Sequence, residues 1–396
     1  SNPEEDPVIL WISGGPGCSG LSTLLLEVGT IIIDYANSKG GRTALKLNEY
    51  GWTKAANIIF IDQPAGAGYS YTKTLESSLT NDTTAARQTY DFLRKWFINH
   101  PKYLENPLYI FGESYGGILV PLVVNEICNG AEARDKPVLN MKGYGLGNPI
   151  TDTFADVNEK YHMLTEWDSC QINYIRQSHF FCSHIISDEQ TFCRSDLFKD
   201  CETIKELGNQ KETLQLAKVN CHGNYVTIDP DNDLCLDALK KINQCLDRIA
   251  KAQISEPWCP ESLATKKQDV WSSYMSSFEE NSINTLQSVV AHRKKEWCRE
   301  DNVRLLHTWA NDKFVQKALN VREGPIIPWT RCNISLSRNI PGPNGIIPYI
   351  KDVASTVSYH QKFTHKRLRV LIFSGDHDML APHISTKMDR VPQSTD

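Results

Sequence analysis

The stretch Leu108-Tyr109-Ile110-Phe111-Gly112-Glu113-Ser114-Tyr115-Gly116-Gly117 decides the fold, because it sets a glycine-flanked serine between two apolar segments. The residues before the glycine predict a buried strand, and the apolar residues at 118–127 predict a helix that ends at Asn129-Gly130. A Gly-x-Ser-x-Gly turn between strand and helix holds the serine hydroxyl at the helix N-terminus, where only glycines tolerate the crowding. We therefore expect Ser114 to be a nucleophile; the alternative is a glycine-rich turn that catalyses nothing.

Three other apolar runs are similar to the strand before Ser114. Residues 8–12, 57–61 and 368–373 each predict a buried strand, and residues 82–100 predict a helix that ends before Pro101. Strands separated by helix-length segments require crossover connections. The sequence therefore predicts an α/β fold whose mostly parallel central sheet carries helices on both faces.

The middle of the chain has a different character. Buried-strand patterns disappear between about 153 and 299, and residues 238–252 predict an amphipathic helix. Nine of the 12 cysteines lie between Cys170 and Cys298. We therefore predict a helical, disulfide-stapled insertion at 153–300, between a first part of the core at 1–152 and a second part at 301–396.

The composition is that of an ordinary globular protein, with 396 residues, 40% of them hydrophobic, and a formal net charge of −5. This mild negative charge gives no electrostatic reason to expect a nucleic-acid or anionic-membrane partner. The longest nearly apolar stretch, at 24–33, is much shorter than the ~20 residues that cross a membrane. The cysteine content favours an oxidising compartment, and sequons at Asn81 and Asn333 predict glycosylation there.

A glycine-rich loop, Gly14-Gly15-Pro16-Gly17, follows the first predicted strand. Such a loop can aim backbone N–H groups at a developing oxyanion, and we expect Gly15 and Tyr115 to supply the two donors. Taken alone, the loop is equally consistent with a structural turn or a phosphate-binding loop. A phosphate loop would require Lys followed by Ser or Thr after the last glycine, where Cys18-Ser19 stands instead.

An acidic turn, Ser374-Gly375-Asp376-His377-Asp378, follows the last predicted strand. A serine hydrolase of this strand and helix pattern keeps its triad carboxylate just after a late strand, in the chain order Ser, Asp, His. We therefore choose Asp378 as the triad acid and Asp376 as the second choice. A solvated acidic turn is the alternative interpretation.

Five motifs together resemble the serine carboxypeptidase family, and the plant serine carboxypeptidase-like branch in particular. They are Trp11-Ile12-Ser13-Gly14-Gly15-Pro16-Gly17-Cys18-Ser19, Phe60-Ile61-Asp62-Gln63-Pro64-Ala65-Gly66, Gly112-Glu113-Ser114-Tyr115-Gly116-Gly117, Gly147-Asn148-Pro149 and Ser374-Gly375-Asp376-His377-Asp378. The resemblance extends from about Pro7 to Asp378 and implies an α/β-hydrolase fold in a secreted or vacuolar protein. It also implies disulfides Cys18–Cys332 and Cys221–Cys235, with a third bridge among Cys245, Cys259 and Cys298.

The triad histidine is where the sequence departs from this family. The family's histidine lies well downstream of the triad acid, whereas 18 residues follow Asp378 here. His377 and His383 stand too close to Asp378 in sequence to reach Ser114 in that fold. Because the chain also starts without Met and has only ten residues before Trp11, we expect both ends to be truncated and the triad to lack its base.

A second departure lies at 164–210, which matches the family poorly and contains Cys170, Cys182, Cys193 and Cys201. Zinc binding with His179 or His184 is the alternative that these cysteines raise. Their spacing includes no Cys-x₂₋₄-Cys pair, so we expect irregular or unpaired cysteines instead of a metal site. We expect no metal, nucleotide, flavin or other cofactor.

The choice between peptidase and acyltransferase depends on three residues. In the family's peptidases, an Asn before Gly-Gly and two glutamates bind the substrate's terminal carboxylate, and one glutamate must be protonated to donate a hydrogen bond to it. This chain has the glutamates, Glu27 and Glu113, but Ser13 in place of the Asn. Glu27 is also consistent with a solvated residue at a helix end.

Ser13, together with Gly147-Asn148-Pro149, is similar to the acyltransferase members, which take acyl groups from glucose esters. We therefore predict acyl transfer from a glucose ester in secondary metabolism through an acyl-enzyme on Ser114. Serine-type carboxypeptidase activity is the first alternative, and a catalytically inactive homologue is the second. The expected partner is a small acyl ester or a peptide, and the sequence assigns no oligomeric state.

Overall fold

The chain folds into two compact units in a computed structural model that describes residues 2–39, 42–74, 79–166, 207–246, 250–254, 256, 299–322, 328–338 and 348–388. Among these, the first unit comprises 2–152 and 299–373, and the second comprises 153–256 and 374–388. The division after residue 152 coincides with the predicted start of the insertion. Residues 374–388 depart from the prediction, which placed them in the core, because Met379 and Ile384 pack with apolar residues of the second unit.

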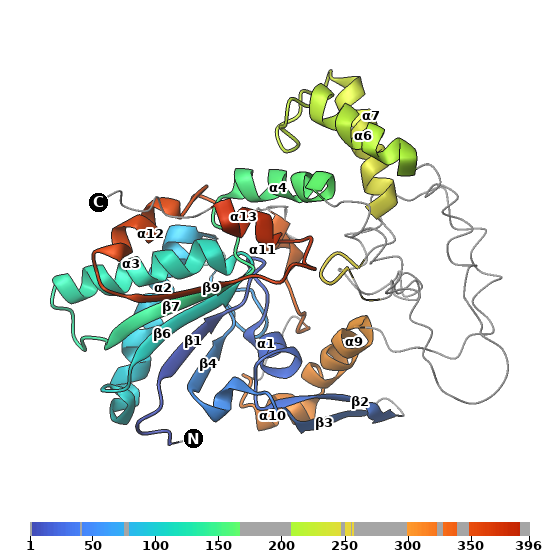
Figure 1. Cartoon of the computed structure of the whole chain (residues 1–396). Coiled ribbons are helices and arrows are strands. Elements are labelled where there is room, and N and C mark those ends of the chain that lie inside the picture. Colours follow the sequence, from blue (N-terminus) through green and yellow to red (C-terminus); the bar gives the residue numbers. More distant parts are fainter. Residues whose placement is uncertain are drawn as a thin grey trace. The chain divides into compact units, whose positions relative to one another are not determined.

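A five-stranded parallel sheet forms the centre of the first unit (Figure 1). Its strands run in the order β4 (Asn57–Ile61), β1 (Val8–Ile12), β6 (Leu108–Glu113), β7 (Met141–Gly147), β9 (Arg369–Phe373). Every neighbouring pair is parallel, so the carboxyl ends of all five strands lie along one edge of the sheet. The parallel α/β architecture predicted from the sequence is confirmed.

Strand β7 is the one strand of this five-stranded sheet that the apolar runs did not predict, because glycines interrupt its sequence Met-Lys-Gly-Tyr-Gly-Leu-Gly. These glycines are required by packing. A Cβ on Gly143 would lie 2.1 Å from the carbonyl oxygen of Arg369, and a Cβ on Gly145 would lie 2.2 Å from the Phe111 ring. The close approach of the neighbouring strands therefore excludes side chains at these positions.

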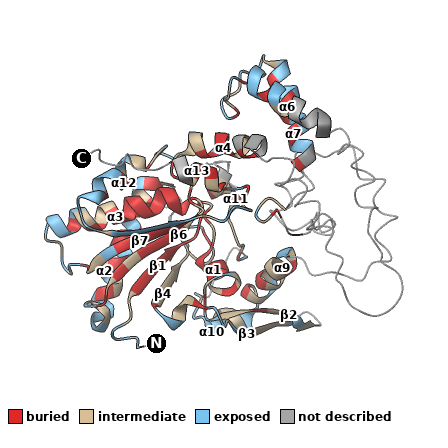
Figure 2. Cartoon of the chain, viewed as in Figure 1, coloured by how far each residue is buried: buried red, intermediate tan, exposed pale blue. Residues whose placement is uncertain are grey.

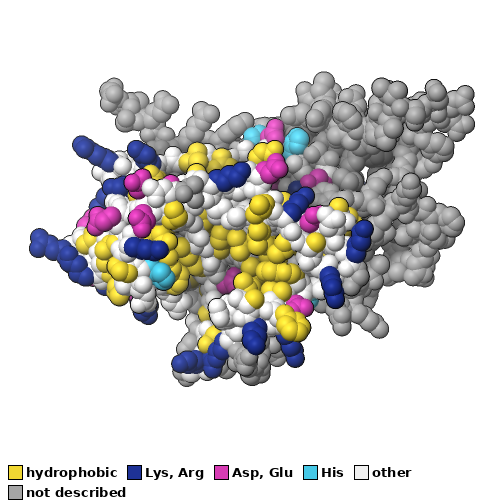
Figure 3. All heavy atoms as spheres, turned by 90° about the horizontal axis from the view of Figure 1, so that it is seen from below, with side chains coloured by type: hydrophobic (Ala, Val, Ile, Leu, Met, Phe, Trp, Pro, Cys, Tyr) yellow, Lys and Arg dark blue, Asp and Glu magenta, His cyan; other side chains and the backbone are white. Residues whose placement is uncertain are grey.

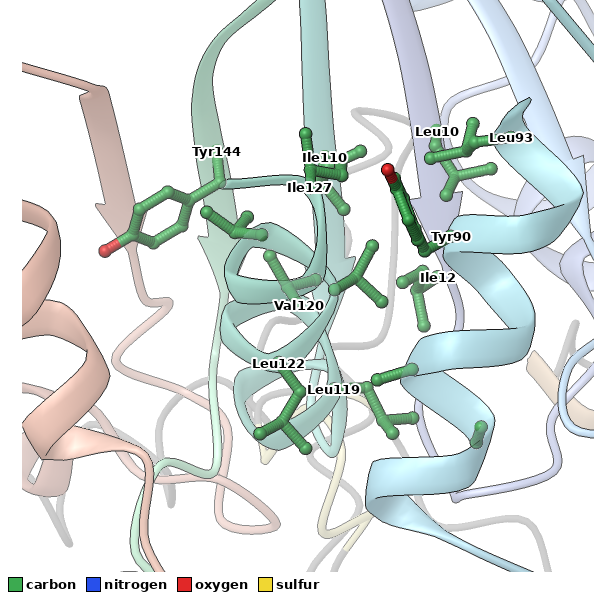
Figure 4. Packing of buried hydrophobic residues seen from close by; sticks show 14 of the residues in the cluster. Leu10, Ile12, Tyr90, Leu93, Ile110, Leu119, Val120, Leu122, Ile127 and Tyr144 are labelled. Atoms are coloured by element: carbon green, nitrogen blue, oxygen red, sulfur yellow. The ribbon is translucent and has the colours of Figure 1, made fainter. Parts of the chain in front are cut away.

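Helices α2 (Asp82–Asn99), α3 (Gly116–Glu132) and α12 (Val357–Thr364) lie together on one face of the sheet (Figure 1). Between the helices and the sheet lies the main hydrophobic core, in which β1 is wholly buried and most residues of β6 and α3 are buried (Figure 2). Figure 4 shows Leu10, Ile12 and Ile110 of the strands in one cluster with Leu93 of α2 and Val120 of α3. Burying each such aliphatic side chain contributes about 1.5–3 kcal/mol to stability.

Helix α3 does not end at Asn129-Gly130 as the sequence predicts, but continues to Glu132. Gly130 has a packing role instead of a terminating one, because a Cβ there would lie 1.8 Å from the Tyr90 hydroxyl oxygen of α2. The glycine lets the two helices approach closely. In contrast, α2 begins and ends within one residue of its predicted bounds, with Asn81 accepting a hydrogen bond from the Thr84 N–H at the helix start (2.7 Å).

The opposite face of the sheet is aromatic. The rings of Trp11, Trp52 and Phe111 pack together, with centroids 5.4–6.0 Å apart. On the same side of the sheet lie α1 (Gly20–Leu26), α9 (Arg299–Ala310) and the hairpin of β2 (Ile31–Lys39) and β3 (Arg42–Leu47) (Figure 1). Viewed from this side, apolar side chains gather in the middle of the described surface (Figure 3).

Short elements complete the first unit. Strand β5 pairs in parallel with β8, and α2 begins directly after β5 in the chain. The short elements are η1 (Trp52–Lys54), β5 (Thr80–Asn81), η3 (Pro101–Tyr103), α10 (Lys313–Ala318), α11 (Ile334–Arg338) and β8 (Tyr349–Ile350).

The second unit is helical in its described part, as the sequence predicts. Its helices are α4 (Thr153–Glu166), α6 (Leu207–Asn220), α7 (Asp233–Leu246) and α13 (His383–Met388). The disulfide Cys221–Cys235, one of the two pairs that the resemblance implies, joins the end of α6 to the start of α7. Helix α7 begins five residues before the helix predicted at 238–252.

Several predictions fall on other parts of the insertion. Those on Cys170, Cys182, Cys193, Cys201, His179, His184, Cys259 and Cys298 lie outside the described residues. Within the described ranges, no helix is long and apolar enough to span a membrane.

Packing of α2 against the sheet gives a direct stability test. Leu93 is completely buried, whereas its neighbour Phe92 is 37% exposed. We expect Leu93→Ala to lower the free energy of unfolding by about 2–5 kcal/mol, through lost burial and the cavity left behind. We expect Phe92→Ala to change it by about 0.5 kcal/mol. Urea unfolding monitored by circular dichroism measures both, and equal losses would contradict the assigned helix face.

Candidate active site

Ser114 stands on a strained turn between β6 and α3. Its φ of 55° lies in the left-handed region, which costs a non-glycine residue about 1–3 kcal/mol. Hydrogen bonds hold the turn: the Ser114 N–H donates to the Gly147 carbonyl (3.1 Å), and the Ser114 carbonyl accepts from the N–H groups of Gly117 (2.9 Å) and Ile150 (2.8 Å). The Ser114 side chain is partly exposed and has no hydrogen-bond partner among the described residues.

The glycine-rich loop after β1 packs directly on this turn. A Cβ on Gly14 would lie 2.7 Å from the Ser114 Cβ and 3.1 Å from its Oγ, so only glycine fits. Gly15 has a φ of 112°, which also requires glycine. Within the described part of the chain, the N–H groups of Gly15 and Tyr115 donate to no acceptor. These are the two donors predicted for an oxyanion.

A disulfide and a buried carboxylate hold the other end of this loop. Cys18 is bonded to Cys332, the second pair that the resemblance implies, and the Ser19 N–H donates to the Arg331 carbonyl (2.7 Å). The Asp62 carboxylate accepts hydrogen bonds from the Ser19 Oγ (2.5 Å) and from backbone N–H groups of Gly20 and Tyr69. Burial raises the pKa of Asp62, and these hydrogen bonds lower it.

Glu113 connects the two loops. Its Oε1 accepts a hydrogen bond from the Gly14 N–H (3.0 Å), and its Oε2 accepts one from the Trp11 indole N–H (2.7 Å). Burial, followed by the nearby charge of Glu27, raises the pKa of Glu113 to about 8. The two predicted glutamates therefore interact, and Glu113 holds a proton through the acidic and neutral range.

Glu27 stands at the C-terminal end of α1. It keeps an exposed surface, yet enough protein surrounds it for burial to raise its pKa, while the charges of Arg331 and Arg299 lower it. The two arginines favour the ionised form of Glu27, so we assign the negative charge of the pair to Glu27 and the proton to Glu113. The arginines were not among the residues predicted from the sequence.

Ser13 is buried, and its hydroxyl shares a hydrogen bond with the hydroxyl of Thr23 in α1 (2.7 Å). The side chain therefore contacts the helix next to the glycine-rich loop. Its predicted role in substrate binding remains a prediction.

The predicted triad acids lie in the second unit. The Asp378 carboxylate is partly buried and accepts hydrogen bonds from the N–H groups of Leu380 (2.7 Å) and Ala381 (3.3 Å). Burial raises the pKa of Asp378, and the nearby Lys160 charge lowers it. Asp376 is exposed, with an oxygen 4.0 Å from the His377 ring, and His383 begins α13. Because Ser114 and Asp378 belong to different units, their pairing remains a prediction.

Both predicted glycosylation sites directly precede a helix, Asn81 before α2 and Asn333 before α11. Asn81 caps α2 through its side-chain oxygen, whereas the Asn333 amide nitrogen donates to the Gly66 carbonyl (2.9 Å). Glycosylation of either residue remains a prediction. Among the described residues, no group of three or more His, Cys, Asp or Glu side chains could hold a metal ion.

Ser114, the predicted nucleophile, thus stands on a strand–turn–helix elbow beside two backbone N–H groups that donate to no acceptor among the described residues. A sequence profile described as serine carboxypeptidase matches residues 1–389. The chain belongs to the serine carboxypeptidase family.

Two plant relatives support the predicted branch. The chain is 34% identical to serine carboxypeptidase-like 17 of Arabidopsis thaliana over 387 residues, an alignment that covers 98% of this chain and 70% of the relative. It is 35% identical to serine carboxypeptidase-like 13 of the same plant over 386 residues, with the same coverage. The resemblance to plant serine carboxypeptidase-like proteins is therefore confirmed.

A solved structure supports the fold. A prohormone-processing carboxypeptidase from Saccharomyces cerevisiae aligns with 96% of this chain and 68% of its own, with a TM-score of 0.58 and 17% sequence identity. At this identity the similarity concerns the fold alone. Together with the parallel sheet and the strand–serine–helix turn, it confirms the α/β-hydrolase fold.

The raised pKa of Glu113 makes stability depend on pH. An ordinary Glu titrates at 4.5, whereas folded Glu113 titrates at about 8, so the folded protein retains a proton that the unfolded chain loses. Stability therefore falls as the pH rises from about 4.5 to about 8. We expect Glu113→Gln to make this fall smaller in urea unfolding at pH 5 and pH 8.

Glu105→Gln is the matched control, because Glu105 is an exposed carboxylate of the same unit. We expect it to leave the pH dependence unchanged. An undiminished fall in the Glu113→Gln variant would show that Glu113 is not the group that titrates.

Proposed function

We propose that this serine carboxypeptidase-like protein acts through an acyl-enzyme on Ser114. Ser114 Oγ attacks the carbonyl carbon of an acyl ester, and the Oγ–H bond breaks as a base takes the proton. The resulting oxyanion accepts hydrogen bonds from the N–H groups of Gly15 and Tyr115, with Asp378, or else Asp376, as the triad acid. The alcohol then leaves with a proton, and water or a second alcohol resolves the acyl-enzyme.

The observation that carries this proposal is the strained Ser114 beside two backbone N–H groups that donate to no acceptor in the described part of the chain. The left-handed conformation of Ser114 is costly, and it presents the hydroxyl beside Gly14. An oxyanion hole of this type supplies a large share of catalysis, since removing one donor typically lowers kcat by about 10²–10³-fold.

Within this mechanism, we favour acyl transfer from a glucose ester over peptide hydrolysis. Ser13 stands where the family's peptidases have Asn, and its hydroxyl is bonded to Thr23. We also propose that this reaction belongs to secondary metabolism and that the protein is secreted or vacuolar.

Carboxypeptidase activity is the alternative that one observation favours. Glu113 has its pKa raised to about 8, so below that pH it carries the proton with which a carboxyl group can donate to a substrate's terminal carboxylate. An inactive homologue is the remaining alternative, and the labelling experiment below tests it.

A covalent probe tests the nucleophile. We expect a fluorophosphonate to label Ser114 and Ser114→Ala to abolish the labelling. In-gel fluorescence followed by peptide mass spectrometry identifies the modified residue. Equal labelling of the wild-type chain and the Ser114→Ala variant would overturn the assignment.

The substrate class is tested by comparing an acyl-glucose donor with a blocked dipeptide. We expect faster acyl transfer from the glucose ester, and we expect Ser13→Asn to shift the ratio of the two rates toward dipeptide hydrolysis. Ser13→Ala is the control, because it removes the hydrogen bond between the Ser13 and Thr23 hydroxyls without adding a side-chain amide. A preference for the dipeptide in the unmodified chain would favour the peptidase alternative.

A further inference from the structure

A buried carboxylate that the proposed mechanism does not use is hydrogen-bonded to the residue that follows Ser114. Asp82, the first residue of α2, is completely buried. Its Oδ1 accepts hydrogen bonds from the hydroxyls of Tyr115 (2.8 Å) and Tyr349 (2.7 Å), and its Oδ2 accepts one from the Val353 N–H (3.0 Å). An ionised carboxylate is costly to bury without such donors, and the N-terminal end of a helix also favours negative charge.

Tyr115 connects this carboxylate to the reaction. Its backbone follows Ser114 directly and carries the N–H proposed as an oxyanion donor. Its side chain is 2% exposed and ends at Asp82. In the proposed mechanism, Tyr115 therefore presents its backbone N–H to the substrate, while its side chain is buried and held by Asp82.

Asp82 is itself held by a separate part of the chain. Strand β8, which contains Tyr349, pairs in parallel with β5, the two residues that lead into Asp82. The Thr80 N–H donates to the Pro348 carbonyl (3.0 Å), and the Thr83 hydroxyl donates to the Asp352 carboxylate (2.8 Å). The Lys351 ammonium lies 5.1 Å from the centre of the Tyr115 ring.

The elbow thus has one hydrogen-bonded carboxylate on each side of Ser114. Glu113 precedes the serine and holds Gly14 and Trp11, whereas Tyr115 follows the serine and is held by Asp82. A left-handed serine persists only where its surroundings fix it. Fixing both flanking residues through their side chains restrains the turn without occupying the N–H groups of the oxyanion hole.

We propose that Asp82 is a positioning residue, which fixes the backbone N–H of Tyr115 toward the oxyanion through the Tyr115 hydroxyl. This inference rests on the proposed role of Tyr115 in an acyl-enzyme mechanism. Donors in an oxyanion hole act through preorganised geometry, so loss of the anchor lowers the rate of acylation even when the donor remains.

Two tyrosines bonded to the same oxygen provide a matched pair of variants. Tyr115→Phe and Tyr349→Phe each remove one hydroxyl from Asp82 Oδ1, but only Tyr115 belongs to the elbow. We expect Tyr115→Phe to lower the rate constant of fluorophosphonate labelling at Ser114 by about tenfold or more, and Tyr349→Phe by less than about threefold. Urea unfolding of both variants measures the stability that each hydroxyl contributes.

A purely structural role for Asp82 predicts a different result. In that case the labelling rate would follow the loss of stability equally in both variants, or the labelling rate of Tyr115→Phe would not fall at all. Either result overturns the proposal. Asp82→Asn and Asp82→Ala add a rescue test, because Asn retains an oxygen that accepts from both hydroxyls. We expect Asp82→Asn to label faster than Asp82→Ala.

Hydrogen exchange separates this proposal from the proposed function. The amides of Gly117 and Ile150 donate to the Ser114 carbonyl and therefore report on the elbow without any chemistry at the hydroxyl. We expect exchange in peptides containing them to be faster in Tyr115→Phe and unchanged in Tyr349→Phe. Absence of Ser114-dependent labelling would refute the proposed function, whereas the absence of this exchange difference would refute the positioning role.

Discussion

The close approach of two loops at the carboxyl edge of the sheet is the constraint on which the rest of the site depends. Parallel pairing aligns Ile12 of β1 with Gly112 of β6, so the chain leaves both strands at the same level. The Gly14 backbone then lies against the Ser114 side chain, with no room for a Cβ. Strand register therefore brings Gly15 and Tyr115, the predicted oxyanion donors, close to Ser114.

Such a junction of backbone segments cannot be stabilised by apolar packing alone, and buried carboxylates take that role. Asp62 holds the start of α1, Glu113 holds Gly14, and Asp82 holds Tyr115. Burial raises the pKa of all three carboxyl groups, since it disfavours their ionised form. Each of these carboxyl groups accepts hydrogen bonds from N–H or O–H groups, and these directional bonds fix the positions of the loops more precisely than apolar contact does.

The sequence predicted the strands and the turn that form this site better than the residues that hold the turn in place. Apolar runs identified β1, β4, β6 and β9, and the glycine pattern identified the elbow, because both signals are local. Asp82 was missed because an acidic residue at a helix start is ordinary, and its tyrosine partners lie 33 and 267 residues away. Gly130 was misinterpreted as a helix end because local sequence does not reveal the Tyr90 hydroxyl against which it packs.

Glu113, of the pair with Glu27, both holds the two loops together and carries a proton that a substrate can use. Both Glu113 oxygens already accept N–H groups, so a proton on Glu113 must point toward a third group. Glu27 is the neighbouring charge, and Arg331 and Arg299 favour its ionised form. When that proton points to Glu27, it keeps Glu113 in place as a bridge between the loops; when it points to a substrate instead, it is a hydrogen-bond donor for a carboxylate or a sugar hydroxyl. The same bridge is therefore compatible with both candidate substrates, and Ser13, which lies beside it, is the residue that can distinguish them.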